Sequence, residues 1–179
     1  MSSCTDTESM LSQIKLQSFD ARQPELLDGV VEIYTEYTGF AERYARNFIA
    51  SFFERDGFVG LVALHQGNVV GMSFGVSSKS GDWWHDKVAQ QVNSHHPALE
   101  DAWVLTQLNI LEAYRGQGIG SLLHDAIVKQ QPHSNLLLST QKSNHLAQDF
   151  YQQHGWYILH AGFAFARGDE PYMIWAKTR

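Results

Sequence analysis

Three glycines fall within five residues of the stretch "YRGQGIGSLLHDAIV", at Gly116, Gly118 and Gly120. An apolar segment precedes them, and the residues that follow have the apolar spacing of a helix. Glycine in an ordered segment costs chain entropy and makes no side-chain contact, so three of them indicate that something approaches this backbone closely. The N-terminus of a helix offers unpaired N–H groups and a partial positive charge, which bind anions. We therefore consider phosphate-binding patterns first.

Three such patterns compete for this loop, and two of them fail on spacing. A Walker loop needs Lys and then Ser or Thr after its last glycine, but Gly120 is followed by Ser121 and Leu122. A dinucleotide fingerprint needs GxGxxG near the start of a sheet and an acidic residue about 20 residues later, and the run "LLLST" supplies none. The remaining pattern is Arg-x-x-Gly-x-Gly, with Arg115, Gly118 and Gly120 at the fixed positions.

The elements around this loop follow a β-α-α-β-β-insert-β-α-β-α-β-β order. The strand, glycine turn, helix and strand in its middle form the kind of crossover that parallel strands require. The sequence contains no repeat and no Pro/Gly-rich linker, so we expect one domain over residues 14–179 behind a flexible tail, residues 1–13. The predicted strands are 14–19, two strands flanking "HQGN", 102–110, 135–140, 156–162 and 172–177, and the predicted helices are 24–39, 41–55, one within the insert, 121–130 and 144–154.

Composition excludes several classes of protein. The chain has 179 residues, 44% of them apolar and 18% charged, which is typical of a soluble globular protein. No segment approaches the roughly 20 apolar residues of a membrane span, and we expect no signal peptide, no membrane and a cytoplasmic location. The net charge of −6 and the lack of a Lys/Arg block argue against nucleic acid. Cys4 is the only cysteine and the histidines are scattered, so we predict neither a catalytic thiol nor a metal site.

The flanks of the loop carry a family resemblance. Upstream, "LTQLNILEAYRGQGIG" has a strand that leads into Arg-x-x-Gly-x-Gly, and downstream "NHLAQDFYQQHGW" has the pattern N-x-x-A-x-x-F-Y-x-x-x-G-aromatic. In this order and at this distance, the two motifs resemble those of the GCN5-related N-acetyltransferases (GNAT superfamily). The resemblance implies an α/β (α+β) fold with a central mixed, mostly antiparallel sheet of about six to seven strands flanked by helices.

The resemblance also implies the cofactor, acetyl-coenzyme A (acetyl-CoA), and the residues that hold it. In this family the backbone N–H groups of the loop receive the pyrophosphate, and the preceding strand pairs with the pantetheine arm. Asn144 is a good helix N-cap by type; whether it also contacts the pantetheine arm stays open. The positions that correspond are Leu108, Ile110, Arg115, Gly116, Gln117, Gly118, Ile119, Gly120, Ser121 and Asn144.

Tyr151 is the catalytic candidate that the resemblance implies. In this family the tyrosine at this position lies near the sulfur and protonates the departing thiolate as general acid. The alternative is a tyrosine that only packs in the core, a role that we instead assign to Phe150. We expect an acyltransferase in which a neutral primary amine attacks the thioester directly, releasing coenzyme A.

The proton acceptor is where the sequence departs from better-known members. Many of them carry Glu or His on the strand before the loop, where this chain has Val104 and Thr106. Protein N-terminal acetyltransferases often carry Glu on the next strand, where this chain has Ser139. The remaining acidic candidates, acting through water or lying simply at the surface, are Glu36, Glu100 and Asp101.

The acceptor pocket is expected from the first two helices and the insert. Its candidate residues are aromatic, and the two adjacent tryptophans of the insert either stack on substrate or form a satellite core or a dimer contact. We expect a small-molecule amine as substrate; the alternatives are a protein or peptide N-acetyltransferase and a non-catalytic acyl-CoA sensor. The aromatic candidates are Tyr34, Tyr37, Phe40, Trp83 and Trp84.

Overall fold

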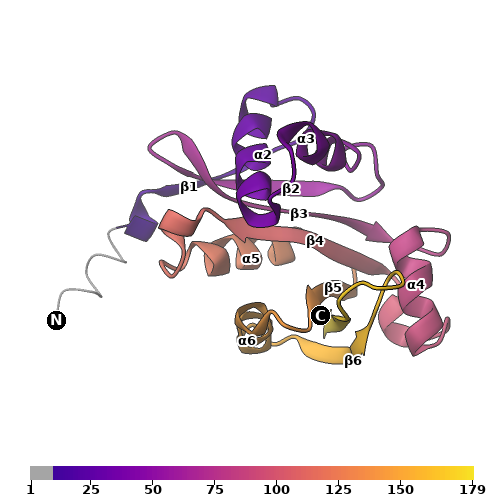
Figure 1. Cartoon of the computed structure of the whole chain (residues 1–179). Coiled ribbons are helices and arrows are strands. Elements are labelled where there is room, and N and C mark those ends of the chain that lie inside the picture. Colours follow the sequence, from indigo (N-terminus) through magenta and orange to yellow (C-terminus); the bar gives the residue numbers. More distant parts are fainter. Residues whose placement is uncertain (1–9) are drawn as a thin grey trace. The chain divides into compact units, whose positions relative to one another are not determined.

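The computed structural model describes residues 10–179, whose helices and strands are labelled in Figure 1. These residues form two compact units. Unit 1 comprises the described residues up to Val76 together with Gln107–Gln131, and unit 2 comprises Ser77–Thr106 and Pro132–Arg179. Residues 1–9, which include Cys4 and most of the predicted tail, lie outside the described part. No helix within residues 10–179 has the length and apolar character that a membrane span requires.

Seven strands form one mixed sheet in the order β1-β2-β3-β4-β5-β7-β6, which confirms the predicted fold class. Strands β1, β2 and β3 pair antiparallel, as do β5 with β7 and β6 with β7, whereas β4 and β5 are parallel. The strands are β1 Ile14–Ser18, β2 Val59–His65, β3 Asn68–Ser78, β4 Ala102–Ile110, β5 Asn135–Gln141, β6 Tyr157–Phe163 and β7 Tyr172–Thr178.

In unit 1, local sequence signals set the ends of the elements. Pro24 occupies the first turn of α2 (Pro24–Thr38), and Gly39 ends this helix in the left-handed region with φ 71°. Gln66 and Gly67, both with positive φ, make the tight hairpin between β2 and β3. The predicted helices 24–39 and 121–130 correspond to α2 and to α5 (Ile119–Gln130).

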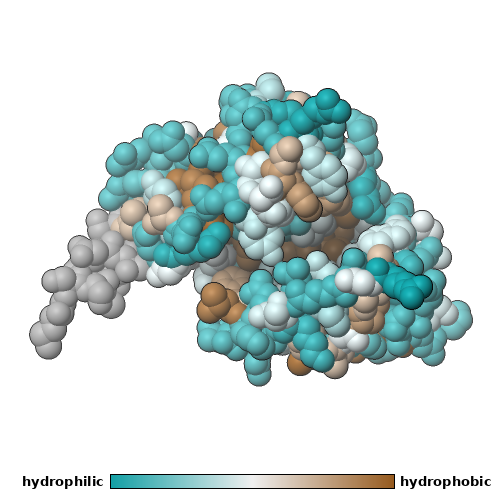
Figure 2. Space-filling model, viewed as in Figure 1, coloured by the Kyte–Doolittle hydropathy of each residue, from teal (hydrophilic) through white to brown (hydrophobic). Residues whose placement is uncertain are grey.

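The second predicted helix is shorter than the pattern indicates. The apolar spacing predicted a helix over 41–55, but α3 spans Glu42–Ala50. Beyond it, the amides of Phe52 and Phe53 bond to carbonyls three residues back, so the chain tightens into turns. The Phe52 ring stays in the core despite this change, which explains why its spacing looks helical. Around α2 and α3 the visible surface is mixed, with a brown patch among teal and white side chains (Figure 2).

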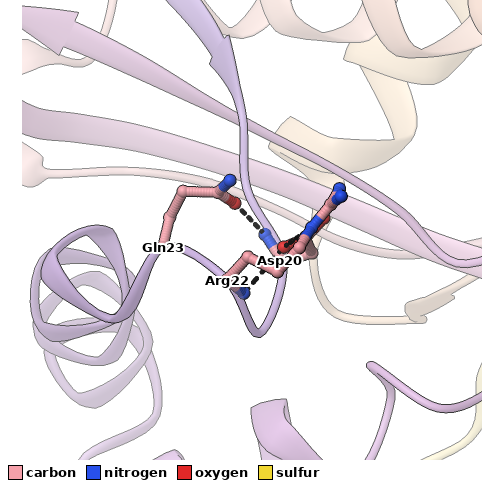
Figure 3. A network of polar contacts seen from close by, with 3 residues as sticks. All are labelled: Asp20, Arg22 and Gln23. Carbon is pink, nitrogen blue, oxygen red and sulfur yellow. Dashed lines mark hydrogen bonds and ion pairs between the residues drawn. The ribbon is translucent and has the colours of Figure 1, made fainter.

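The loop between β1 and α2 is held by a local polar network. Arg22 donates from Nε to both carboxylate oxygens of Asp20 at 3.1 Å, and the amide of Asp20 donates to the side chain of Gln23 at 2.9 Å (Figure 3). The hydrogen bonds from Arg22 lower the pKa of Asp20. Residues 20–22 line a cavity of about 480 Å³ together with Phe53 and residues 55–58.

Helices pack against both faces of the strands of unit 1. Met72, Phe74 and Val76 of β3 lie in the core with α2 and α3 residues. Gly71 alternates to the opposite face, where an added Cβ would lie 2.7 Å from Ile110 Cδ1 and 3.0 Å from the Leu123 side chain of α5. This close approach explains a glycine within β3 and seats α5 against the strand.

Unit 2 packs α4 (Trp83–Val92), from the predicted insert, onto its strands. Val88 is fully buried in a core with residues of β4, β5 and β7, and the short helix Pro97–Leu99 adds Ala98 and Leu99. The last helix, α6 (His145–Gln153), agrees with the predicted range 144–154. The predicted strands and helices of this part of the chain therefore match the structure closely.

Candidate functional site

The glycine loop leads directly into α5 in unit 1. Gly116 and Gly118 have φ of 72° and 84°, a region that side chains rarely adopt, and Gly118 is the N-cap residue of the helix. The first turn of α5 carries no acidic residue, unlike the first turns of α2, α3 and α4. The first turn of this 12-residue helix therefore brings no carboxylate of its own to the positive end, which suits that end to an external anion.

Side chains of the loop turn back onto the chain that precedes it. Arg115 donates from Nε to the carbonyl oxygen of Ile110 at 3.0 Å, and Gln117 donates from Nε2 to the carbonyl oxygen of Ala113 at 3.2 Å. Arg115 is half-exposed, and its Nη2 lies 3.8 Å from a carboxylate oxygen of Glu36. The hydrogen bond of Arg115 to Ile110 therefore helps to fix the shape of the loop.

Glu36 of α2 holds the short helix η2 (Glu112–Tyr114), which comes just before the loop. Its Oε1 accepts a hydrogen bond from the amide of Glu112 at 2.7 Å and lies 3.8 Å from Nη2 of Arg115. From the hairpin side, His65 Nδ1 lies 3.3 Å from the hydroxyl of Tyr114. The sequence offered Glu36 as a remote base acting through water or as a surface acid. Nothing local in the sequence indicates the observed contact, because Glu36 and Glu112 are 76 positions apart.

The other predicted cofactor-binding residues of unit 1 differ in how far their side chains are buried. Ile119 is buried and its side chain faces Gly71, so only its backbone is available to a ligand. Leu108, Ile110 and Ser121 are half-buried. The packing of Ile110 Cδ1 beside Gly71 agrees with the expected core role of its side chain.

A residue of the predicted tail lies against the loop. A Cβ built on Gly118 would come within 3.0 Å of Leu11 Cδ1. Met10–Ser12 are helical, and the Gln13 side chain lies 3.3 Å from Nε2 of His65. The described end of the chain is therefore packed beside the loop, a contact that the polar composition of the tail did not indicate.

In unit 2, α6 presents the second motif. The side chain of Asn144 accepts a hydrogen bond from the amide of Ala147 at 3.1 Å and so caps the helix, as its type indicates. Tyr151 is only 8% exposed, and its ring packs edge-on against Phe150 and Trp156. The expectation that Phe150 takes the core position is wrong: Phe150 is half-buried, and Tyr151 is the more enclosed ring because Trp156 covers it.

The parallel pairing of β4 and β5 is short. It joins Ala102–Val104 to Asn135–Leu137 in three pairs, while both strands continue beyond it. The residues beyond it in unit 2 include Thr106, at a position where the resemblance leads us to expect Glu or His, and Ser139, where it leads us to expect Glu in protein N-terminal acetyltransferases. Ser139 Oγ accepts a hydrogen bond from the indole N–H of Trp84 at 3.4 Å. Trp84 therefore lies beside the end of the ladder.

The aromatic acceptor candidates have different surroundings. Tyr34 is 5% exposed and stacks on Phe48 at 5.1 Å, so its ring belongs to the core of unit 1. Tyr37 and Phe40 are exposed to 47% and 50%. In unit 2, Trp83 is exposed and stacks on Phe165, a residue that sequence reasoning missed because it lies in the loop between two strands.

The acidic candidates of unit 2 are Asp101, which makes hydrogen bonds within the protein, and Glu100. Asp101 Oδ2 accepts hydrogen bonds from the amide and the hydroxyl of Ser134, each at 2.7 Å, and Oδ1 lies 3.5 Å from His133 Nδ1. The bonds from Ser134 hold the pKa of Asp101 below its usual value, which makes this carboxylate a weaker proton acceptor. The carbonyl of Glu100 accepts a bond from Asn135, and its side chain is exposed.

Comparison with known proteins gives a family match. A family model described as the acetyltransferase (GNAT) family matches residues 27–156. Among curated proteins, no significant match is found.

Several solved structures share the fold. A GNAT-family acetyltransferase from Bacillus cereus ATCC 10987 aligns with 15% identity and a TM-score of 0.65, over 93% of this chain and 97% of that one. An aminoglycoside 6'-N-acetyltransferase from Enterococcus faecium aligns with 16% identity and a TM-score of 0.66, over 92% and 96%. An aminoglycoside 6'-N-acetyltransferase complexed with coenzyme A aligns with 16% identity and a TM-score of 0.64, also over 92% and 96%.

Proposed function

Since the chain belongs to the acetyltransferase (GNAT) family, we propose that it transfers the acetyl group of acetyl-CoA to a primary amine of a small molecule. The observation that carries the proposal is the loop before α5, where two glycines with positive φ precede a helix N-terminus that has no acidic residue in its first turn. This arrangement fits a pyrophosphate, because a doubly charged group needs backbone N–H donors and space free of Cβ atoms.

The cofactor-binding residues follow from this fit. The backbone of Arg115–Gly120, with Ser121, receives the pyrophosphate, and Gln117 keeps the loop in shape through Ala113. The backbone of Leu108 and Ile110 pairs with the pantetheine arm as an added strand. Asn144 already caps α6, and its side-chain amide N–H groups supply a second contact to that arm.

The chemical step is direct attack of the neutral amine on the thioester carbonyl. The nitrogen forms the new amide bond as the carbon–sulfur bond breaks, and coenzyme A leaves as the thiol. Tyr151 gives its phenolic proton to the leaving sulfur as general acid, and the proton that the nitrogen releases as the amide forms restores the phenol through water. An alkyl ammonium has a pKa of about 10.4, so the amine must lose a proton before it attacks. We assign that proton to water rather than to Asp101, whose carboxylate is bonded to Ser134.

The small-molecule acceptor is supported by two lines. Aminoglycoside acetyltransferases are among the structures that share the fold. Ser139 stands where protein N-terminal acetyltransferases often carry Glu, and Trp84 bonds to it. The proposed acceptor contacts are Tyr37 in unit 1 and Trp83 and Trp84 in unit 2, whereas Tyr34 is a packing residue in the core of unit 1. We further propose that the chain is a single catalytic domain, that it acts in the cytoplasm, and that it binds no metal, nucleic acid or membrane. The exposed aromatic side chains are the proposed contact surface of a homodimer.

Mass spectrometry of the reaction products tests the proposal. The protein is incubated with acetyl-CoA and, separately, polyamines, aminoglycosides, amino acids and short peptides. Acetylation confined to a class of small amines supports the proposal. Acetylation of peptide N-termini alone would move the function to the protein N-acetyltransferases, and cofactor binding with no product in any arm would favour an acyl-CoA sensor.

A further inference from the structure

We propose that Glu36 is a positioning residue that fixes the glycine loop for cofactor binding, and that it is not the proton acceptor of the reaction. The inference rests on the proposed function in one respect, namely that this loop binds acetyl-CoA. Glu36 lies in α2, whereas the loop begins after η2, and both belong to unit 1.

The first contact supplies a missing helix cap. Leu111 is the N-cap residue of η2 and provides no side-chain hydrogen bond to it. The carboxylate of Glu36 accepts the amide hydrogen of Glu112 at 2.7 Å instead. A short helix leaves its first N–H groups without partners, and an ionised acceptor makes a stronger bond to them than a neutral one. Glu36 thus performs from another element the task that a local cap residue usually performs.

The second contact reaches the other end of the same turn. Nη2 of Arg115 lies 3.8 Å from Glu36 Oε1, and Nε of Arg115 bonds to the carbonyl of Ile110. Both side chains of this ion pair are partly exposed, so its own contribution is small. Its value is geometric: one carboxylate oxygen holds both Glu112 and Arg115, and Gly116 follows at once.

The position of Glu36 in its own helix supports a specific role. It lies in the last turn of α2, where the helix dipole is negative, and this turn contains no basic residue. An acidic side chain at this place is unfavourable unless contacts outside the helix compensate it. The amide of Glu112 and the guanidinium of Arg115 provide that compensation, so the carboxylate is held toward the loop.

A set of three variants tests the inference. Glu36→Ala removes the acceptor, and Glu36→Gln keeps a side-chain oxygen for the Glu112 amide but removes the charge. Glu32→Ala is the matched control, since Glu32 is an exposed acid one turn earlier on the same helix. The measurements are the Kd of acetyl-CoA by calorimetry, kcat at saturating cofactor and amine across pH, and amide hydrogen exchange of residues 112–118 without cofactor.

We expect Glu36→Ala to raise Kd and KM for acetyl-CoA about tenfold, as loss of one charge-assisted hydrogen bond does. The kcat and its pH profile should stay within about twofold of wild type, because chemistry proceeds normally once the cofactor is bound. Amide exchange in the loop should rise. Glu36→Gln should recover most of the affinity, and Glu32→Ala should match wild type.

Other outcomes overturn the inference. A Glu36→Ala variant that binds acetyl-CoA like wild type, or whose loop exchanges no faster, excludes the bracing role. A variant with lower kcat and a lost limb of the pH profile makes Glu36 the proton acceptor. Failure of wild type itself to bind acetyl-CoA would overturn the proposed function, and the exchange data would still report separately on whether Glu36 braces the loop.

Discussion

The indole N–H of Trp84 donates a hydrogen bond to the hydroxyl of Ser139 at 3.4 Å, so helix α4 is tied to strand β5 within unit 2. The bond falls two residues after Leu137, where the parallel ladder with β4 ends. Both rings lie near Phe165, but Trp83 stacks on it at 5.4 Å and is exposed, whereas the Trp84 ring is tilted at 6.5 Å. The two adjacent tryptophans therefore have different roles.

Trp84→Phe should weaken binding of the acceptor amine and leave binding of acetyl-CoA unchanged. Phenylalanine keeps an aromatic ring in the core but loses the bond to Ser139, so the wall of the proposed acceptor pocket loosens. We expect KM for the amine to rise about fivefold, the effect of one net hydrogen bond, with KM for acetyl-CoA unchanged. Trp83→Phe is the comparison: it keeps an aromatic ring at the neighbouring acceptor contact and removes no bond to Ser139, so we expect less than about twofold change in KM for the amine. A larger effect at Trp83 would place the acceptor on the exposed stack with Phe165.

Gly118→Glu should abolish tight binding of acetyl-CoA. The new carboxylate opposes the pyrophosphate, the φ of 84° strains any side chain, and the Cβ meets Leu11. Gly67→Glu is a matched control, because Gly67 has φ 85° and no atom within 4 Å of an added Cβ. Calorimetry should show a loss of about a hundredfold or more in affinity for Gly118→Glu alone. Equal affinity of the two variants for acetyl-CoA would show that the pyrophosphate does not bind to this loop.

Tyr151→Phe separates catalysis from binding. The phenyl ring keeps the packing against Trp156, whereas the proton for the leaving sulfur is gone. We expect kcat to fall between about tenfold and a hundredfold, with the Kd of acetyl-CoA unchanged. Tyr157→Phe, an exposed tyrosine on β6, serves as the control. If kcat is unaffected, the tyrosine is a packing residue and the thiolate leaves without an acid.

Asp101→Asn should destabilise the protein in a pH-dependent way. Hydrogen bonds from Ser134 lower the pKa of Asp101 in the folded state, with a smaller contribution from His133. A lowered carboxyl pKa stabilises the fold at pH values above the unfolded pKa of about 3.9, and this stabilisation is lost as pH falls through the folded pKa. Asparagine tolerates the φ of 42° at this position.

The measurement is the melting temperature of Asp101→Asn and wild type between pH 3 and pH 7. The variant should have a lower melting temperature than wild type at neutral pH. This difference in melting temperature should become smaller as pH falls below about 4. Glu100→Gln is the neighbouring control, with no such trend expected. A difference that is the same at both ends of the range would show that the charge of Asp101 contributes nothing.

Local signals made most of the fold predictable. Pro24, Gly39 and Asn144 mark helix ends through their own backbone or side-chain chemistry, and the structure places them there. The end of α3 was not predictable, because Phe52 keeps helical spacing while its backbone leaves the α-helix. Periodicity reports which face is buried and not which hydrogen bonds the backbone makes.

The long-range parts of the candidate site were hidden for a physical reason. Glu36 and Glu112 are 76 residues apart, and Trp84 and Ser139 are 55 residues apart. Such pairs meet only after the sheet and helices have packed, so no spacing in the sequence indicates them. The loop motif was visible because its chemistry lies in consecutive residues, from Arg115 to Gly120.

The most direct test of the account is the initial rate of coenzyme A release from acetyl-CoA at saturating cofactor, measured with and without each amine of a panel. The account predicts release that requires a small primary amine and that saturates with its concentration. Binding of acetyl-CoA with no amine-dependent release, or release with peptides alone, would contradict it.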